Sequence, residues 1–337
     1  MPKVELRYSD GALREVDTDP FETVYQAAAR SDAAVLTDCL EGACATCKAR
    51  CLSGEYDLID PSFDALSQHE QTSGHVLLCQ MEARTDCVVE MPYSYAFATH
   101  AAPSQEQTKV FALDWLGEHV AKLVLEAPAP LVFSPGQYAQ LAVPGTDQHR
   151  PYSFANPSGE SQVTFYVRLL DDGVMGNYLK EHAQVGDAMT MRSPLGSFYM
   201  RPGTGPIVMI AGGTGVAPML SMLHALAQST AKRSVHLFHG ARVPQELFAA
   251  GPLTQLREAG MDVTYVQSAD ELGGAQRLPE GIVHGRVTDA VPHDLLRAEA
   301  ADVYLCGPPA MVAASEGLLG ELGVPTPRIF SERFNPA

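Results

Sequence analysis

The stretch Arg150-Pro151-Tyr152-Ser153-Phe154-Ala155-Asn156 decides how the rest of this 337-residue chain can be organised. It places a guanidinium, an aromatic ring and a hydroxyl within four residues. A guanidinium suits a pyrophosphate, and an aromatic ring suits a flat heterocycle. Seen alone the pattern is weak, because a Tyr-Ser pair in a strand usually serves packing. Its position gives it weight, since four cysteines precede it and a glycine-rich turn follows it.

Short strand-like runs surround this stretch. They lie at residues 119–126, 138–143, 162–170 and 188–191. Turn sequences that contain Pro and Gly separate them. Many short strands with turns between them indicate an antiparallel β-barrel, which we place at residues 108–202. The polar, Pro-containing segment 99–107 has no periodicity and is predicted to be a linker.

The region after the barrel alternates apolar strands with helical stretches. Residues 206–211 form a continuous apolar run that suits a buried parallel strand, and the turn Gly212-Gly213-Thr214-Gly215 follows it. Its glycines let the backbone approach a phosphate, and the start of the next helix favours an anion. The turn lacks the G-x-G-x-x-G fingerprint of a standard Rossmann site. Further strands are expected at 234–239, 262–267 and 302–305, so residues 203–337 are predicted to form a doubly wound α/β domain.

Four cysteines dominate the region before the barrel. Cys39, Cys44 and Cys47 are followed after 31 residues by Cys79, which is the C-x4-C-x2-C…C spacing of plant-type [2Fe–2S] ferredoxins. A structural zinc site usually brings two close cysteine pairs, and only Cys44 and Cys47 form one. Cys51 could compete as fourth ligand, but all four ligands would then crowd onto one short loop. Residues 1–98 are therefore predicted to be a [2Fe–2S] domain, with Cys51 and Cys87 as small buried hydrophobes.

Composition and charge limit the function. A chain of 337 residues with 46% hydrophobic and 19% charged residues is an ordinary globular protein of two or three domains. Its net charge of −17 argues against nucleic acid as a partner. Residues 1–98 hold 17 Asp and Glu against 7 Lys and Arg, a net charge of −10. This acidic excess either steers a basic partner or serves solubility.

The N-terminus has no signal-peptide pattern, and the most apolar run, 207–227, is broken by Gly, Pro and His. These features favour a buried strand, turn and helix over a membrane span. We therefore expect a cytoplasmic protein with no membrane partner. In a reducing compartment, seven cysteines indicate metal or redox work rather than disulfides.

Several motifs resemble known families. Ser134-Pro135-Gly136-Gln137-Tyr138 and the R-x-Y-S pattern at 150–153 resemble the flavin domain of the ferredoxin–NADP reductase superfamily. The strings GGTGVAP at 212–218 and CGPP at 306–309 resemble its nicotinamide domain. The order ferredoxin, flavin domain, nicotinamide domain resembles the reductase component of bacterial ring-hydroxylating dioxygenases of the benzoate and anthranilate type. The resemblance implies a multidomain α+β and α/β protein, with a β-grasp ferredoxin domain, that uses FAD, one [2Fe–2S] cluster and NADH.

The resemblance also implies functional residues. Those at FAD are Arg150 on phosphate, Tyr152 against the isoalloxazine, Ser153 near N5, the phosphate-side Val167, Arg168, Met175, Gly176 and Asn177, and Phe334 covering the flavin. Asn177 stands where the family often has Ser or Thr, which weakens a side-chain role there but not a backbone role. Those at NADH are Gly212, Gly213, Thr214, Gly215, Arg242, Cys306, Gly307 and Pro308. Ser153, Cys306, Glu332 and Phe334 are implied as catalytic. Cys306 is about as well explained as a buried thiol at a strand end, and Phe334 as a packed tail.

The nicotinamide specificity depends on the residues after the second strand of this domain. Arg242 is compatible with NADPH, because an Arg can bind a 2′-phosphate. No second basic residue lies nearby, so the sequence favours NADH.

The implied function is an oxidoreductase that passes electrons from NADH through FAD and the cluster to the Rieske centre of a terminal oxygenase. One alternative is a reductase for a di-iron monooxygenase, which uses the same three domains. Another is a flavin and iron–sulfur sensor without turnover. The turn at 212–215 together with Phe334 argues against a sensor, because a sensor needs no gated hydride site.

Overall fold

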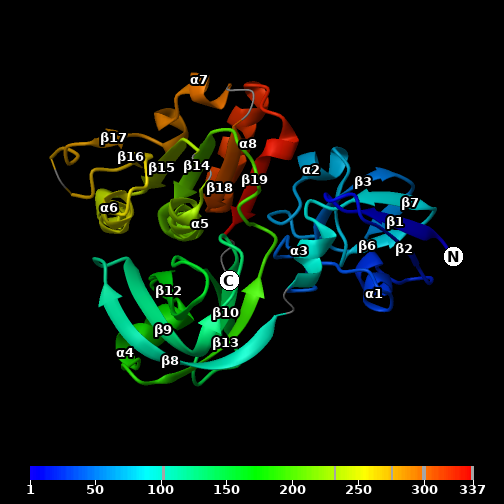
Figure 1. Ribbon diagram of the computed structural model, residues 1–337, viewed down its shortest axis with the longest axis horizontal. Helices are drawn as coiled ribbons and strands as arrows, with labels where there is room; N and C mark the ends of the chain where they lie inside the picture. The colour runs from blue at the N-terminus through cyan, green and yellow to red at the C-terminus, as the bar shows by residue number, and fades with distance from the viewer. Residues whose placement is uncertain (101–102, 231–232, 275, 298–300, 335–337) are drawn as a thin grey trace. The chain divides into compact units, whose positions relative to one another are not determined.

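The computed structural model describes residues 1–100, 103–230, 233–274, 276–297 and 301–334. The chain divides into two compact units (Figure 1). One consists of Met1–Pro103 with Leu195–Ser197, and the other of Ser104–Pro194 with Phe198–Ala337. Each unit is described in turn.

The first unit is built on a mixed five-stranded sheet in the order β2-β1-β7-β3-β5. Its strands are β1 (Lys3–Arg7), β2 (Leu13–Asp17), β3 (Lys48–Ser53), β5 (His75–Leu77) and β7 (Cys87–Glu90). Strands β1 and β7, the first and last of this sheet along the chain, pair in parallel, whereas the pairs β1–β2, β3–β5 and β3–β7 are antiparallel. The strands β4 (Tyr56–Leu58) and β6 (Met81–Ala83) form a separate antiparallel pair.

The described residues of this unit also form the short helices α1 (Val24–Ala29), α2 (Gln68–Thr72) and α3 (Tyr95–His100). Helix α1 begins after the N-cap Thr23, whose hydroxyl accepts a hydrogen bond from the Gln26 amide at 3.3 Å. The helix buries Val24, Ala27 and Ala28. A mixed sheet with a packed helix and a long loop between α1 and β3 confirms the predicted α+β ferredoxin fold.

The second unit begins with an antiparallel sheet of six strands in the order β11-β10-β13-β8-β9-β12. Their bounds are β8 (Ser104–Trp115), β9 (Val120–Leu131), β10 (Tyr138–Ala142), β11 (His149–Ser153), β12 (Glu160–Arg168) and β13 (Ala188–Leu195). Just beyond β11, the Ala155 amide donates to the Thr164 carbonyl of β12 at 3.0 Å. This contact joins the two ends of the curved sheet (Figure 1) and confirms the predicted barrel. Helix α4 (Val174–Glu181) follows β12.

The segment 99–107, predicted to be a linker, differs in the structure. Helix α3 ends at His100, and β8 begins at Ser104. Residues 104–107 pair with β13 but are mostly exposed. Alternate residues of β8 become buried only from Thr108 and Val110 onward. A strand whose residues face solvent has no apolar periodicity, so the sequence pattern concealed it. The domain limits 1–98, 108–202 and 203–337 stay predictions.

The rest of the second unit contains a parallel sheet in the order β17-β16-β15-β14-β18-β19. Its strands are β14 (Ile207–Gly212), β15 (Val235–Ala241), β16 (Val263–Ala269), β17 (Ile282–His284), β18 (Asp302–Gly307) and β19 (Ile329–Arg333). The chain starts at the central strand β14, winds outward through β17, and returns to the other side of β14 as β18. The carboxyl ends of β14 and β18 therefore form a switch point, where ligands bind in such sheets.

Helices cover both faces of this sheet. They are α5 (Val216–Gln228), α6 (Ala250–Glu258), α7 (His293–Leu296) and α8 (Pro309–Glu321), with short 3₁₀ turns at Gly213–Gly215, Pro244–Glu246, Val287–Ala290 and Thr326–Arg328. Alternate residues of β14 enter different cores: Met209 packs with α5 and α6, and Ile210 packs with α8. The doubly wound prediction is confirmed. In the described part of the chain, no helix is both long and apolar enough to span a bilayer.

Candidate functional site

The four predicted cysteine ligands lie together in the first unit, as two pairs. The Cys47 and Cys79 sulfurs are 3.3 Å apart. Cys39 and Cys44 form the other pair, with the Cys44 amide 3.3 Å from the Cys39 sulfur. Among the described residues, no three His, Cys, Asp or Glu side chains converge on a single ion. Two thiol pairs suit a centre with two irons, each held by one pair, better than a mononuclear zinc site.

The loop between these cysteines turns its amides toward sulfur. Leu40, Gly42 and Ala45 have positive φ angles of 61°, 74° and 58°, so the chain winds tightly. The Glu41 and Ala43 amides each donate to the Cys39 sulfur at 3.4 Å. Hydrogen bonds from the Cys44 thiol and from these amides lower the pKa of Cys39 to about 5. The loop therefore favours thiolate, the form that binds iron.

Gln80 supports this loop and was missed by the sequence reasoning. Its amide nitrogen donates to the Leu40 carbonyl at 3.3 Å, and its oxygen accepts from the Asp60 amide at 3.1 Å. A Cβ at Gly42 would lie 3.0 Å from the Gln80 side chain and 3.1 Å from the Asp60 carbonyl oxygen. A glycine is thus required where Gln80 packs on the loop. The position of Gln80 directly after Cys79 was the only signal available.

Cys51 and Cys87 lie outside the four-cysteine group. Cys87 is buried, and its thiol donates to the backbone carbonyls of Thr85 and Glu55. Cys51 is half-buried, and its thiol donates to the Ser53 carbonyl at 3.3 Å.

In the second unit, the side chains of β11 differ in their burial and in their hydrogen-bond partners. Ser153 is buried and Tyr152 is half-buried beside the barrel core. The Arg150 guanidinium donates to the Gln148 side chain at 2.5 Å and to the His149 carbonyl at 2.9 Å, so it lies along its own loop. Val167 is fully buried in the barrel core. Only the backbone of Val167 can contact a ligand.

The phosphate-side helix differs in one detail from the prediction. The Asn177 amide donates to the Gly173 carbonyl at 2.8 Å, so it is used within α4. The amides without an intrahelical partner in the first turn are those of Val174, Met175 and Gly176. At this helix start, the amides that could donate to an anion are therefore those of residues 174–176, one residue earlier than predicted.

Three predicted catalytic residues meet from distant parts of the chain. The Ser153 hydroxyl lies 3.4 Å from a Glu332 carboxyl oxygen. Glu332 on β19 is paired in register with Cys306 on β18. The Phe334 amide donates to the Gly307 carbonyl at 2.8 Å, which places Phe334 directly after this group. The structure therefore brings Ser153, Cys306 and Glu332 together, with Phe334 adjacent in the chain.

The environment of this group keeps both acids neutral near pH 7. Glu332 is half-buried as a whole residue, and it lies beside the buried residues Ser153 and Cys306. Burial raises the Glu332 pKa from 4.5 to about 8, and the hydrogen bond from Ser153 opposes the shift. Burial and the nearby Glu332 carboxyl raise the pKa of the Cys306 thiol. Cys306 is therefore a thiol rather than a thiolate, which argues against a nucleophilic role.

The raised Glu332 pKa predicts a pH dependence of stability. The folded state binds this proton more tightly than the unfolded chain does. The contribution of Glu332 to the free energy of unfolding is therefore complete below pH about 4.5 and is lost as pH rises through about 8. The urea midpoint should therefore fall with rising pH over this interval, and Glu332→Gln should have a weaker fall. Unfolding can be followed by fluorescence of Trp115, the single tryptophan. Equal pH slopes in the two proteins would contradict the raised pKa.

The glycine turn after β14 packs closely on the end of β18. A Cβ at Gly215 would lie 2.2 Å from the Cys306 carbonyl oxygen. Gly307 has φ of 149°, and a Cβ there would lie 2.9 Å from the Gly212 nitrogen. Both contacts are with backbone atoms, which cannot rotate away. The predicted glycines thus let the two strand ends meet at the switch point.

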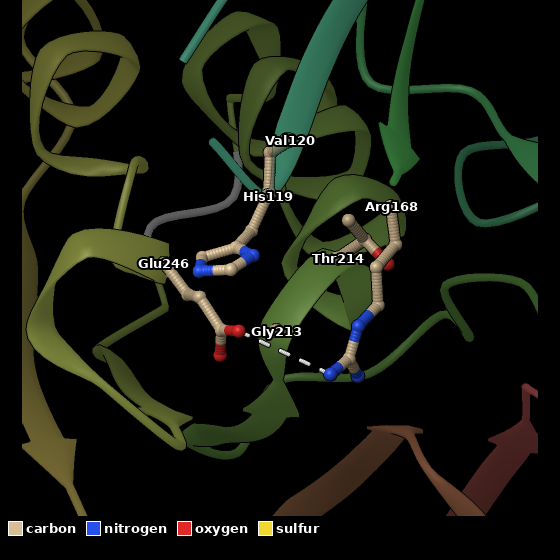
Figure 2. A pocket seen from close by; sticks show the side chains of 6 residues that line it. All are labelled: His119, Val120, Arg168, Gly213, Thr214 and Glu246. Carbon is tan, nitrogen blue, oxygen red and sulfur yellow. Dashed lines mark ion pairs between the residues drawn. The ribbon is translucent and has the colours of Figure 1, made fainter. Parts of the chain in front are cut away.

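A pocket opens beside this turn (Figure 2). It is lined by His119, Val120, Arg168, Gly213, Thr214 and Glu246. Arg168 and Glu246 point toward one another, with 3.9 Å between guanidinium and carboxylate (Figure 2). Glu246 is buried and also accepts from the Arg242 amide at 3.2 Å. His119 and Glu246 were missed by the sequence reasoning, since no local motif marks them.

Strand alternation explains where Arg168 points. Phe165 and Val167 enter the barrel core, so Tyr166 and Arg168 project from the outer face of β12. Tyr166 packs on Phe248 of the doubly wound domain, with ring centroids 4.4 Å apart. Arg168 therefore lies with the glycine turn, whereas the sequence reasoning assigned it to the flavin phosphates. This placement favours a role for Arg168 at the nicotinamide dinucleotide rather than at the flavin.

The fold and the sites together define a class of protein, the iron–sulfur flavoprotein oxidoreductases that use a nicotinamide. Three family models match: a 2Fe-2S iron-sulfur cluster binding domain at residues 8–84, an oxidoreductase FAD-binding domain at 110–199 and an oxidoreductase NAD-binding domain at 209–317. The predicted cofactors, FAD, a [2Fe–2S] cluster and a nicotinamide dinucleotide, are confirmed. The chain belongs to the family of dioxygenase electron transfer components of the benzoate, anthranilate and toluate type.

Full-length relatives support this identification. The chain is 35% identical to the 2-halobenzoate 1,2-dioxygenase electron transfer component of Burkholderia cepacia, covering 99% of this chain and 98% of that protein. It is 34% identical to the propane 2-monooxygenase reductase component of Rhodococcus jostii, covering 95% and 88%. The crystal structure of the cytochrome P450 reductase GcoB of Amycolatopsis has a TM-score of 0.73 and 30% identity, covering 100% and 99%.

Proposed function

We propose that this protein oxidises NADH and delivers electrons, through FAD and its [2Fe–2S] cluster, to the Rieske centre of an aromatic-ring-hydroxylating dioxygenase. The single observation that carries the proposal is the meeting of Ser153, Cys306 and Glu332 between the barrel and the switch point. A flavin held by the barrel would face a nicotinamide held by the doubly wound domain at this place. NADH as donor and the free thiols also support a cytoplasmic location.

The bound flavin would accept a hydride from NADH and release electrons singly to the cluster, and the chain positions these groups. For the flavin, we assign the anion-binding role to Arg150 and the first amides of α4, and the ring contact to Tyr152. Ser153 can donate its hydroxyl toward N5. The hydroxyl would then no longer donate to Glu332, and the neutral Glu332 carboxyl can donate its proton to the Ser153 oxygen instead.

For the dinucleotide, we assign the pyrophosphate to the turn Gly212, Gly213, Thr214 and Gly215. Arg168 lies beside this turn and would meet the pyrophosphate oxygens, with Glu246 holding its guanidinium in place. Gly307 and Pro308 border the nicotinamide position, and the uncharged thiol of Cys306 lines it. Arg242 is exposed and reaches the adenosine side. Phe334 covers the flavin face until the nicotinamide arrives.

We propose three modules with the predicted limits: ferredoxin at 1–98, flavin at 108–202 and nicotinamide at 203–337. The four ligands of the ferredoxin module are Cys39, Cys44, Cys47 and Cys79. The two-pair arrangement of the thiols supports this set.

An exposed apolar patch beside the cluster loop is a suitable docking surface for the oxygenase. It consists of Leu40, Ile59 and Phe63, which are 46%, 57% and 71% exposed. Hydrogen bonds hold its segments together, because Gln80 bonds to both Leu40 and Ile59, and the Ser62 amide donates to the Gly42 carbonyl at 3.1 Å. Exposed carboxylates at Glu41, Asp60 and Asp64 surround it. A partner with an apolar centre and a basic rim fits this surface.

The test of the function is an anaerobic NADH titration followed by visible absorbance and EPR. Flavin and cluster should both bleach, with about three electrons taken up and a rhombic signal from the reduced cluster. Steady NADH-dependent reduction of cytochrome c should follow. A cluster that stays oxidised while the flavin bleaches would contradict the proposed electron path. Bound NADH without turnover would instead support a sensor.

A second acceptor is favoured by one observation, the 34% identity to a propane 2-monooxygenase reductase component over 95% of this chain. The two acceptors are distinguished by pairing the protein with a purified Rieske dioxygenase and with a purified di-iron hydroxylase. Coupled product formation with the first alone supports our proposal. Coupling with the second alone would replace it.

We predict that Phe63→Ala weakens the productive pairing. Loss of an exposed aromatic anchor should raise the KM for the oxygenase roughly tenfold, while NADH-dependent reduction of ferricyanide stays unchanged. Phe21→Ala is the matched control, because Phe21 is 82% exposed and is not part of the patch. Equal KM values for Phe63→Ala and the unaltered protein would rule out the patch as a docking surface.

A further inference from the structure

His239 is a fully buried histidine that makes two side-chain hydrogen bonds at the end of β15. Its Nε2 lies 2.9 Å from the Gly213 carbonyl oxygen, and its Nδ1 lies 3.0 Å from the Tyr265 hydroxyl. No surface of the residue is exposed. No sequence motif marks His239. Register explains the contact, because His239 pairs with Ala211 of β14, two residues before Gly213.

The partners determine the protonation of the ring. A carbonyl oxygen can only accept, so Nε2 carries the hydrogen that it donates to Gly213. Burial lowers the pKa of His239 to about 4, which keeps the ring neutral. Nδ1 is then without a hydrogen and accepts from the Tyr265 hydroxyl. Tyr265 and His239 thus form a directed chain of hydrogen bonds that ends on the glycine turn.

The Val216 amide also donates to the Gly213 carbonyl, and His239 adds a second donor that helps to fix the orientation of this peptide unit. Gly213 has φ of 52° and open space where a Cβ would be, so nothing in its own side chain restrains it. In a trans peptide, the carbonyl and the following N–H point in opposite directions. With the Gly213 carbonyl held toward the buried His239, the Thr214 N–H points away from it. Gly213 and Thr214 both line the accessible pocket beside Arg168.

We propose that His239 is a positioning residue for the dinucleotide: it holds the Gly213 carbonyl inward, so that the Thr214 N–H is presented to the diphosphate. Tyr265 supports it by directing the ring hydrogen to Nε2. The inference rests on the proposed assignment of NADH to the turn at 212–215. Its effect is on diphosphate binding, not on electron transfer.

The test is calorimetric binding of ADP, which carries the diphosphate and no nicotinamide, to the holoprotein. His239→Phe keeps a ring for the edge contact with Phe248, whose centroid is 5.9 Å away, but has no donor for Gly213. It should weaken ADP binding about tenfold, the effect of one lost hydrogen bond to a strained loop. His239→Gln, which offers an amide donor at similar reach, should restore the affinity to within about threefold. Flavin and iron content should not change.

Two outcomes overturn the proposal. One is unchanged ADP affinity in His239→Phe, or in Tyr265→Phe if the first variant does not fold. The other is an equal loss of affinity for nicotinamide mononucleotide, which has no diphosphate and would report a general distortion. The readout is separate from the proposed function, because a protein that never oxidises NADH can still bind ADP. If the unaltered protein binds no ADP, the assignment of NADH to this turn fails, and the inference fails with it.

Discussion

Replacing Cys79 by Ser is expected to abolish the iron–sulfur cluster and to leave the flavin bound. The Cys79 sulfur lies 3.3 Å from that of Cys47, so the substitution removes half of one ligand pair, and a hydroxyl is a poor substitute for a soft thiolate. NADH-dependent reduction of cytochrome c should fall by more than the roughly 10–100-fold that loss of an outer-shell partner costs. Visible absorbance and iron content measure the cluster directly.

The matched control is Cys51→Ser. The Cys51 thiol donates to the Ser53 carbonyl and belongs to neither pair, so this variant should keep a normal spectrum. Reduction of ferricyanide by the flavin should be unaffected in both variants. A normal cluster spectrum in Cys79→Ser, or its loss in Cys51→Ser, would show that the fourth ligand is wrongly assigned.

Gly215→Ala is expected to disrupt the switch point and NADH binding together. The added Cβ would lie 2.2 Å from the Cys306 carbonyl oxygen, and neither backbone atom can move without parting the ends of β14 and β18. Overpacking of this kind costs about 1–3 kcal/mol, which corresponds to a fall in melting temperature of roughly 2–12 °C. NADH affinity should fall more than about tenfold, because the turn that we assign to the pyrophosphate would move. Calorimetric melting and NADH binding provide the measurement.

Gly317→Ala is the control of the same chemical size. Gly317 lies within α8, and an added Cβ there meets nothing within 4 Å. An alanine in a helix interior should stabilise the protein by up to about 1 kcal/mol. If both variants melt like the unaltered protein, the close approach at Gly215 is not a constraint.

The sequence by itself determined the features that depend on neighbours along the chain. The spacing of Cys39, Cys44, Cys47 and Cys79 predicted a two-iron site, because a single loop supplies three of the ligands. The apolar run before Gly212 predicted a buried parallel strand, and that strand is fully buried. Turn residues between short strands predicted the barrel. Each of these signals is local, since periodicity and turn chemistry are properties of consecutive residues.

The tertiary structure alone decided which distant residues meet. Ser153 and Glu332 are 179 positions apart, and only the docking of β11 against β19 places them within 3.4 Å. Sequence resemblance named both residues, but their burial, and with it the raised pKa of Glu332, depends on the packing around them. The same holds for Gln80 and His239, whose roles come from partners far along the chain.

The strand that the sequence pattern concealed and the direction of the Arg168 side chain have the same physical origin. The strand at 104–107 was missed because its pairing with β13 supplies order without apolar alternation. Arg168 was assigned to the flavin phosphates, but the alternation of β12 directs it to the glycine turn and Glu246. The pairing of a strand, and the direction in which its side chains point, depend on which of its two faces is buried. That choice is made only when the barrel and the parallel sheet pack together, so it could not be read from neighbouring residues.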